Sequence, residues 1–204
     1  GISMMTIQLE GASGHSSDPS LGANALDAMH RVMGELIAMR EELAAANQNN
    51  AFAVNVPTMN LGCMRAGDNP NRICGHAALQ IDLRLLPGMD SEAIHEALER
   101  RIAAVVANTG VSLQLHKAYP PIPPFQSDPN GDLLGALSGL SGNQPGTVAF
   151  GTEAHFMQTL GMETVVWGPG SIDQAHQPNE YLDKAQLAPA TDTLRRVIQK
   201  FCLV

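Results

Sequence analysis

The clearest element of this sequence is Leu79-Gln-Ile-Asp-Leu-Arg-Leu85, a run in which apolar and polar side chains alternate. A period of two residues is typical of a β-strand that packs one face and exposes the other. The apolar residues therefore predict a buried face, and Asp82 and Arg84 predict a polar face. Pro87-Gly88 follows and predicts the turn that ends the strand.

The flanking sequence predicts further strands and helices around this one. Alternating residues predict strands over 4–10 and 111–116, and the segment 53–63 is expected to form another strand, interrupted at Pro57. Apolar residues at helical spacing predict one helix from an Asn24 N-cap to about residue 47, and another from Asp90 or Ser91 to about residue 108. The resulting order of strand, helix, strand, strand, helix, strand suits an α+β fold, a four-stranded antiparallel sheet with two helices on one face.

A proline-rich run, Tyr119-Pro-Pro-Ile-Pro-Pro-Phe125, separates this domain from the rest of the chain. Proline removes backbone donors and restricts the residue before it, so the run predicts an extended linker. We therefore expect a first domain over residues 4–118 and a second part over residues 119–204. The second part is expected to contain helix 129–140, strand 147–150, helix 153–160, strand 164–167, a glycine-rich loop and a C-terminal helix. So few elements make a thin core, and we expect this part to complete a larger α/β domain.

Composition excludes several classes of protein. The 204 residues carry 12 Lys plus Arg against 20 Asp plus Glu, a formal charge of −8, which disfavours a nucleic-acid partner. No apolar run approaches the length of a membrane-spanning helix, so no membrane association is expected. Three irregularly spaced cysteines favour a reducing cytoplasm over a disulfide-stapled secreted protein. Because the chain starts at Gly1 without an initiator Met, we expect a fragment or a processed chain.

Two histidines lie in loops after predicted strands or apolar segments, where catalytic and ligand-binding residues are often found. His176 lies in an irregular loop that follows an apolar segment, and a neutral imidazole there could bind a metal. A loop histidine is more often a surface residue, however, and one histidine cannot supply the three or four ligands of a zinc site. His15 follows the first strand among small residues and could donate to a developing oxyanion. The alternative is that it merely neighbours a helix cap formed by Ser17 or Asp18.

Arg84 and Asn71 are the other candidates that spacing alone brings forward. The guanidinium of Arg84 projects from a polar strand face and could hold a carboxylate through two parallel hydrogen bonds. Asp82 lies on the same face and could simply pair with it. Asn71 follows Gly67-Asp-Asn-Pro70, where ordinary turn chemistry explains it equally well.

Several motifs together resemble the C-terminal half of the dinuclear-zinc amidohydrolase and aminopeptidase family, which includes acetylornithine deacetylase and succinyl-diaminopimelate desuccinylase. The matching stretches are Gly14-His-Ser-Ser-Asp-Pro19, Gly67-Asp-Asn-Pro-Asn-Arg-Ile-Cys74, Ile81-Asp-Leu-Arg84 with Pro87-Gly-Met89, Gly151-Thr-Glu-Ala154 and Gly168-Pro-Gly-Ser-Ile-Asp-Gln-Ala-His-Gln-Pro178. The similarity extends over nearly the whole chain. The last motif is the most specific.

This resemblance implies a bilobed, dimeric enzyme with a lid or dimerisation domain inserted into a metal-bearing catalytic domain. It implies that His176 is a metal ligand and that His15 reaches the partner subunit's site to bind the reacting carbonyl oxygen. It also implies that Asn71 and Arg84 hold the carboxylate of the substrate and that Glu153 contacts its amino group. Hydrogen-bond donors to the substrate would come from Gly151, Thr152, Gly170 and Ser171.

The resemblance also implies a reaction, namely removal of the acetyl group from N-acetylornithine in arginine biosynthesis. Two zinc ions, with cobalt as an alternative, would serve the complete enzyme. The family's other metal ligands and its general base are absent from this sequence, so we expect the chain alone to be inactive and not to bind zinc stoichiometrically. The alternatives are an inactive dimerisation module, or a deacylase of the same family acting on another N-acyl amino acid or on succinyl-diaminopimelate.

Overall fold

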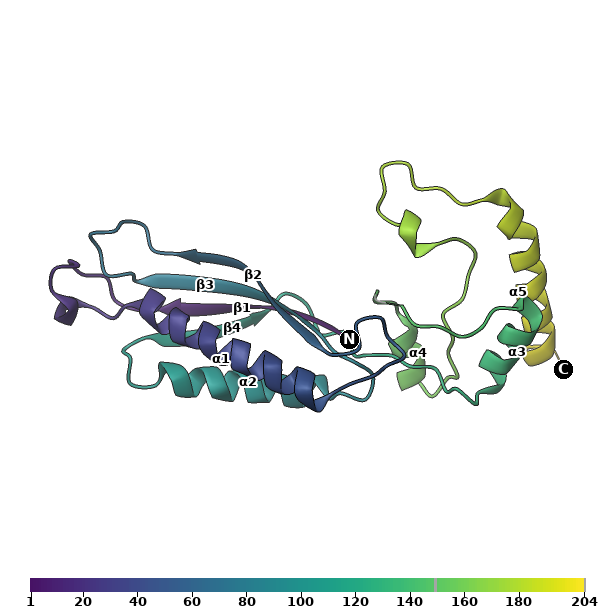
Figure 1. Cartoon of the computed structure of the whole chain (residues 1–204), viewed down its shortest axis with the longest axis horizontal. Helices are drawn as coiled ribbons and strands as arrows, with labels where there is room; N and C mark the ends of the chain where they lie inside the picture. Colours follow the sequence, from purple (N-terminus) through teal and green to yellow (C-terminus); the bar gives the residue numbers. More distant parts are fainter. Residues whose placement is uncertain (149, 204) are drawn as a thin grey trace. The chain divides into compact units, whose positions relative to one another are not determined.

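A computed structural model describes residues 1–148 and 150–203, which form two compact units. The first unit is Gly1–Pro124 and the second is Phe125–Val204 (Figure 1). Most of the predicted linker belongs to the first unit, because Ile122 exchanges backbone hydrogen bonds with Ile2. No helix in the described part of the chain has the length and apolar character needed to span a membrane.

The first unit is built on a four-stranded sheet, in the spatial order β2-β3-β1-β4. Its strands are β1 (Ile2–Glu10), β2 (Thr58–Ala66), β3 (His76–Arg84) and β4 (Ser112–Lys117), and each neighbouring pair is antiparallel. The pairing of β1 with β3 runs from Ile2 opposite Arg84 to Glu10 opposite His76. The predicted α+β class with its antiparallel sheet is therefore confirmed.

The second strand differs from its predicted bounds of 53–63. It begins at Thr58, immediately after Pro57, because proline cannot donate to the ladder and its predecessor is conformationally restricted. It then continues to Ala66 through an irregularity between Leu61 and Cys63. The residue of β2 between Leu61 and Cys63 has no partner on β3 and forms a β-bulge, after which β2 continues its pairing with β3.

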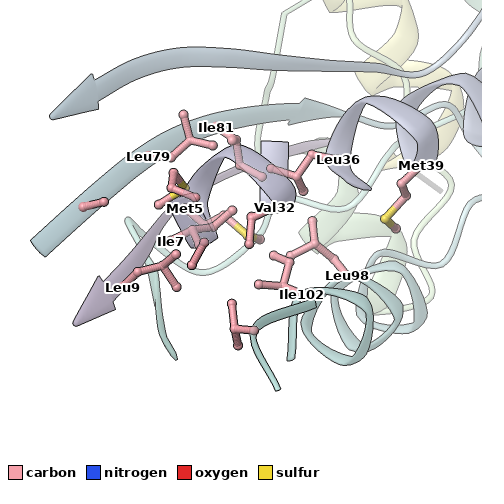
Figure 2. Close-up of a cluster of buried hydrophobic side chains, with 14 of the residues drawn as sticks. Met5, Ile7, Leu9, Val32, Leu36, Met39, Leu79, Ile81, Leu98 and Ile102 are labelled. Atoms are coloured by element: carbon pink, nitrogen blue, oxygen red, sulfur yellow. The ribbon is translucent and has the colours of Figure 1, made fainter. Parts of the chain in front are cut away.

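Two helices cover one face of this sheet, as Figure 1 shows. They are α1 (Ala25–Ala46) and α2 (Ser91–Val106), and the side chains of Asn24 and Asp90 accept hydrogen bonds from their first-turn N–H groups. Apolar residues from both helices meet the inward-facing residues of β1 and β3 in one core (Figure 2). The labelled core residues are Met5, Ile7, Leu9, Val32, Leu36, Met39, Leu79, Ile81, Leu98 and Ile102. At the surface, Arg101 of α2 pairs with Glu35 and Glu42 of α1.

The second unit contains α3 (Asp132–Ser141), α4 (Ala154–Thr159) and α5 (Leu187–Phe201), and α3 packs against α5. These helices lie close to their predicted positions. The strand predicted over 164–167 was wrong, since no strand is assigned there, and the one predicted over 147–150 includes residue 149, which lies outside the described residues. A short apolar run can predict an extended segment, but a strand also needs a ladder partner, and the described part of this unit contains no ladder.

One polar contact lies inside the first unit. The side chains of Ser3 on β1 and His95 on α2 are both buried, and Ser3 Oγ lies 2.7 Å from His95 Nε2. Burial lowers the pKa of His95 below its ordinary value of 6.5, the positive charge of Lys117 adds to this, and Glu92 opposes it. His95 is therefore a neutral, buried hydrogen-bonding group that links the first strand to the second helix.

This lowered pKa makes the stability of the chain depend on pH. Below pH 6.5 the unfolded state takes up a proton at His95 that the folded state resists, so the free energy of unfolding should fall as pH falls through that value. We expect urea unfolding, followed by circular dichroism, to show lower stability at about pH 5 than at about pH 7.5. His95→Gln, which keeps a hydrogen-bonding group but does not titrate, should reduce that difference, whereas His30→Gln on the exposed face of α1 should leave it unchanged.

Candidate functional site

A loop after β1 carries the first candidate group. The chain leaves the sheet at Gly11, and Ala12 and Ala23 then exchange two backbone hydrogen bonds of 2.9 and 3.0 Å. A Cβ atom on Gly11 would lie 2.0 Å from the carbonyl oxygen of Ala23, and one on Gly22 would lie 2.2 Å from that of Ala12. Only glycine permits this close crossing of the two segments, which fixes the start of the loop.

The loop brings His15 and Asn71 together, although they are distant in sequence. The Ser16 N–H donates to the Asn71 carbonyl oxygen at 3.1 Å, and the Ile73 N–H donates to the Gly14 carbonyl oxygen at 2.9 Å. Both Asn71 and His15 are exposed to solvent. We call these two residues the distal loop pair, because they lie beyond the sheet end where Glu10 pairs with His76.

Hydrogen bonding determines which nitrogen of His15 can donate. The backbone N–H of Ser17 donates to Nδ1 of His15 at 3.2 Å, and the Ser17 hydroxyl oxygen lies 2.7 Å from the same nitrogen. Since a backbone N–H can only donate, Nδ1 is the acceptor and the proton of the neutral ring is on Nε2. His15 therefore offers an Nε2–H donor, the form that stabilises a developing oxyanion.

Arg84 is held by the carboxylate that shares its strand face. Its Nε lies 3.0 Å from both carboxylate oxygens of Asp82, and its Nη2 lies 2.9 Å from one of them. The predicted ion-pair alternative is thus present in the structure. Asp82 occupies only one edge of the guanidinium, however, and the Nη1 edge is a second surface that can donate to a carboxylate.

Arg84 and the distal loop pair lie at opposite ends of the sheet. Arg84 is at the end of β3 opposite Ile2, and the distal loop pair follows the other end, where His76 meets Glu10. Between the first and last of the 9 residues of this strand there are eight steps of about 3.3 Å, so the two ends are roughly 26 Å apart. A single amino-acid-sized ligand therefore cannot contact Arg84 and Asn71 of the same chain.

In the second unit, Thr152 and Glu153 form the turn that precedes α4. The Ala154 N–H donates to Thr152 Oγ1 at 3.2 Å, and the Phe156 N–H donates to the Glu153 carbonyl oxygen at 3.0 Å. His155 was not among the residues predicted from sequence, yet its buried ring contacts this turn through Nδ1, 3.2 Å from the Thr152 carbonyl oxygen. Its position directly after Gly151-Thr-Glu-Ala154 was the one sequence feature that could have pointed to it. Its burial depends on tertiary packing and could not be predicted from that position.

The second candidate loop of this unit contains Gly170, Ser171 and His176. Gly170 has a φ of 109° and donates its N–H to Gln186 Oε1 at 2.6 Å, and the Ser171 hydroxyl accepts from the Asp173 N–H. His176 adopts a φ of 62°, which is uncommon for a residue with a side chain. Strained backbone of this kind is found more often at functional sites than elsewhere.

A metal centre needs several ligands, and the described residues do not assemble one. Among residues 1–148 and 150–203, no group of three or more His, Cys, Asp or Glu side chains is placed to hold a metal ion. His176 is therefore at most one ligand of such a centre. Zinc in a catalytic site takes three protein ligands, so the described part of the chain does not fit a zinc site by itself.

Comparison with known proteins gives a consistent result. The model of the family described as peptidase dimerisation domain matches residues 1–109. Acetylornithine deacetylase from Pectobacterium atrosepticum is 41% identical over 196 residues, which is 96% of this chain and 51% of that protein. The enzyme of the same name from Edwardsiella ictaluri is 40% identical over equal shares. The chain thus spans about half the length of the curated relatives it matches.

Solved structures share the fold at low sequence identity. A tripeptidase from Staphylococcus aureus superposes with a TM-score of 0.67 at 16% identity, over 98% of this chain and 51% of that protein. An aminopeptidase from Bacillus cereus gives a TM-score of 0.65 at 17% identity, over 98% and 52%. At this level of identity the likeness shows the fold alone.

The close crossing at Gly22 can be tested against a glycine in open space. Gly22→Ala should lower the free energy of unfolding by about 1–3 kcal/mol and speed amide exchange at Ala12 and Ala23, because its Cβ meets a backbone oxygen. Gly34→Ala, inside α1 where an added Cβ would meet no heavy atom within 4 Å, should instead raise stability by about 1 kcal/mol. Equal effects of the two substitutions would contradict the role given to Gly22.

Proposed function

The chain belongs to the peptidase dimerisation domain family, and we propose that it forms the lid and part of the catalytic domain of a metal-dependent amide hydrolase. In this proposal the complete protein removes the acetyl group from N-acetylornithine in the cytoplasm, giving ornithine and acetate for arginine biosynthesis. The identity of 40–41% with proteins named acetylornithine deacetylase, over 96% of the chain, supports it. Another N-acyl amino acid or succinyl-diaminopimelate is the alternative substrate.

The observation that carries the proposal is the separation between Arg84 and the distal loop pair. Within one chain these groups lie roughly 26 Å apart, which is too far for both to contact one small substrate. They can act on the same substrate only if Arg84 comes from one copy of the chain and the distal loop pair from another. We propose that Arg84 holds the substrate carboxylate in one subunit. The distal loop pair of a second copy then approaches the same substrate, with the Nε2–H of His15 donating to the reacting carbonyl oxygen. The match to a dimerisation-domain family supports this arrangement.

The second unit supplies the remaining contacts in the proposal. Gly151, Thr152, Gly170 and Ser171 would present donors to the substrate, Glu153 would meet its amino group, and His176 would bind metal. Zinc, with cobalt as an alternative, would supply an electrophile and an activated water when bound. Because the described residues do not form the metal site, we expect this chain alone to be inactive and to show less than one tightly bound zinc per chain in metal analysis.

A second candidate function is dimerisation without chemistry. The match of residues 1–109 to a dimerisation-domain family favours it for the 204-residue chain taken alone. We propose that the dimer surface combines the free side of β2 with the outward face of α1, which contacts β2. An edge strand exposes unpaired backbone groups, and Leu26 and Ile37 of α1 add exposed apolar area.

The proposed dimer surface can be tested by placing an arginine on α1, with an arginine on α2 as the control. Ile37→Arg places a charge on the exposed face of α1, so it should convert a dimer of the 21.6 kDa chain into a monomer in light scattering. Ala104→Arg places the same charge on the exposed face of α2 and should leave the mass unchanged. A wild-type chain that is monomeric at micromolar concentration would count against the surface.

Sharing of the site between subunits can be tested with the complete protein. His15→Ala should lower kcat about 10²–10³-fold through loss of an oxyanion donor, and Arg84→Ala should mainly raise KM. Mixed dimers of these two variants contain one intact site, so a random mixture assayed at substrate well below the raised KM should recover about one quarter of wild-type activity. The control mixture of His15→Ala with Asn71→Ala should recover none, since both changes lie in the distal loop pair.

A further inference from the structure

The order in which neighbouring side chains of α4 are buried and exposed is unusual. The imidazole of His155 is 5% exposed, whereas the neighbouring Phe156 and Met157 are 56% and 41% exposed. Hydrophobicity alone would favour the opposite arrangement, since burying a polar ring is unfavourable unless it is hydrogen-bonded. A specific contact of the imidazole therefore accounts for its inward position.

That contact is with the turn in front of the helix. Nδ1 of His155 lies 3.2 Å from the carbonyl oxygen of Thr152, and because a carbonyl oxygen can only accept, Nδ1 carries the ring proton. Nε2 is then an acceptor. It is buried and has no hydrogen-bond partner among the described residues. The ring thus satisfies one nitrogen through Thr152 and leaves the other unsatisfied, which costs free energy of folding.

The bond to Thr152 completes the ordering of the turn. The Ala154 N–H donates to Thr152 Oγ1, the Phe156 N–H donates to the Glu153 carbonyl oxygen, and His155 holds the Thr152 carbonyl. The first two bonds come from backbone groups of the helix that follows. The third holds the carbonyl of Thr152, so it restrains the peptide that joins Thr152 to Glu153.

We infer that His155 is a positioning residue that orients the Thr152–Glu153 turn toward the cationic side chain of the substrate. The inference rests on the proposed function, in which Glu153 meets the amino group of N-acetylornithine. An aligned carboxylate recognises that ammonium group, but it adds nothing for a substrate with the same carbon chain and no ammonium. N-acetylnorvaline is such a substrate, so the preference between these two compounds reports on the turn.

Two substitutions separate positioning from packing. His155→Phe keeps an aromatic ring, removes the donor to Thr152 and also removes the unsatisfied Nε2, so thermal stability should stay equal or rise. His155→Asn offers an amide N–H in place of the Nδ1–H but leaves space unfilled, so stability should fall while the turn is retained. Loop order and stability should therefore change in opposite directions, which a purely structural role would not produce.

The first measurement uses the 204-residue chain itself. Hydrogen exchange at the Ala154 and Phe156 amides should be at least about threefold faster in His155→Phe than in wild type, and near wild type in His155→Asn. The second uses the complete protein, where His155→Phe should reduce the preference for N-acetylornithine over N-acetylnorvaline about tenfold, through KM and not kcat. His155→Asn should restore the preference.

The outcomes distinguish this inference from the proposed function. If His155→Phe leaves both the exchange rates and the substrate preference unchanged in an active enzyme, the inference is overturned and the proposed function stands. If the complete wild-type protein hydrolyses neither compound, the proposed function fails. The exchange rates then decide whether His155 orders the turn, and equal rates in the three proteins overturn that role as well.

Discussion

The antiparallel pairing of β1 with β3 sets the position of every candidate group in the first unit. β1 is an inner strand, paired with β3 on one side and β4 on the other, and its register places Arg84 at one end of the sheet and His76 at the other. A shift of one residue would send the apolar residues of β1 to the open face and break their contact with the helices. The packing of the sheet against its helices therefore holds the functional groups at a fixed separation.

Much of the first unit could be predicted from sequence, because its information is local. The alternation of Leu79, Ile81 and Leu83 predicts both the strand and its buried face, and the Asn24 cap predicts the start of α1. The pairing of Asp82 with Arg84 could also be foreseen, since residues two apart in a strand share a face. The proximity of His15 and Asn71 could not, because it depends on contacts between two loops distant in sequence.

The fold of the second unit is less predictable from its sequence. The apolar stripe of its C-terminal helix could be predicted from periodicity, but an apolar segment such as 164–167 becomes a strand only if another strand pairs with it. The role of His155 could not be predicted for a related reason. Whether a histidine is buried, and which nitrogen donates, follows from the fold around it and not from the residues beside it.

The loop that carries His15 is held mainly through its main chain. Hydrogen bonds from Ser16 and Ile73 and the crossing of Ala12 with Ala23 are backbone contacts, while the glycines keep the segments close. Apart from the contact of His15 with Ser17 and the bonds that Asp18 accepts from Ser20, side chains between residues 15 and 21 can therefore be exchanged at little cost to the path of the loop. Such a segment is a natural place for chemical diversification, since point substitutions there can alter what the protein recognises without a new scaffold having to evolve.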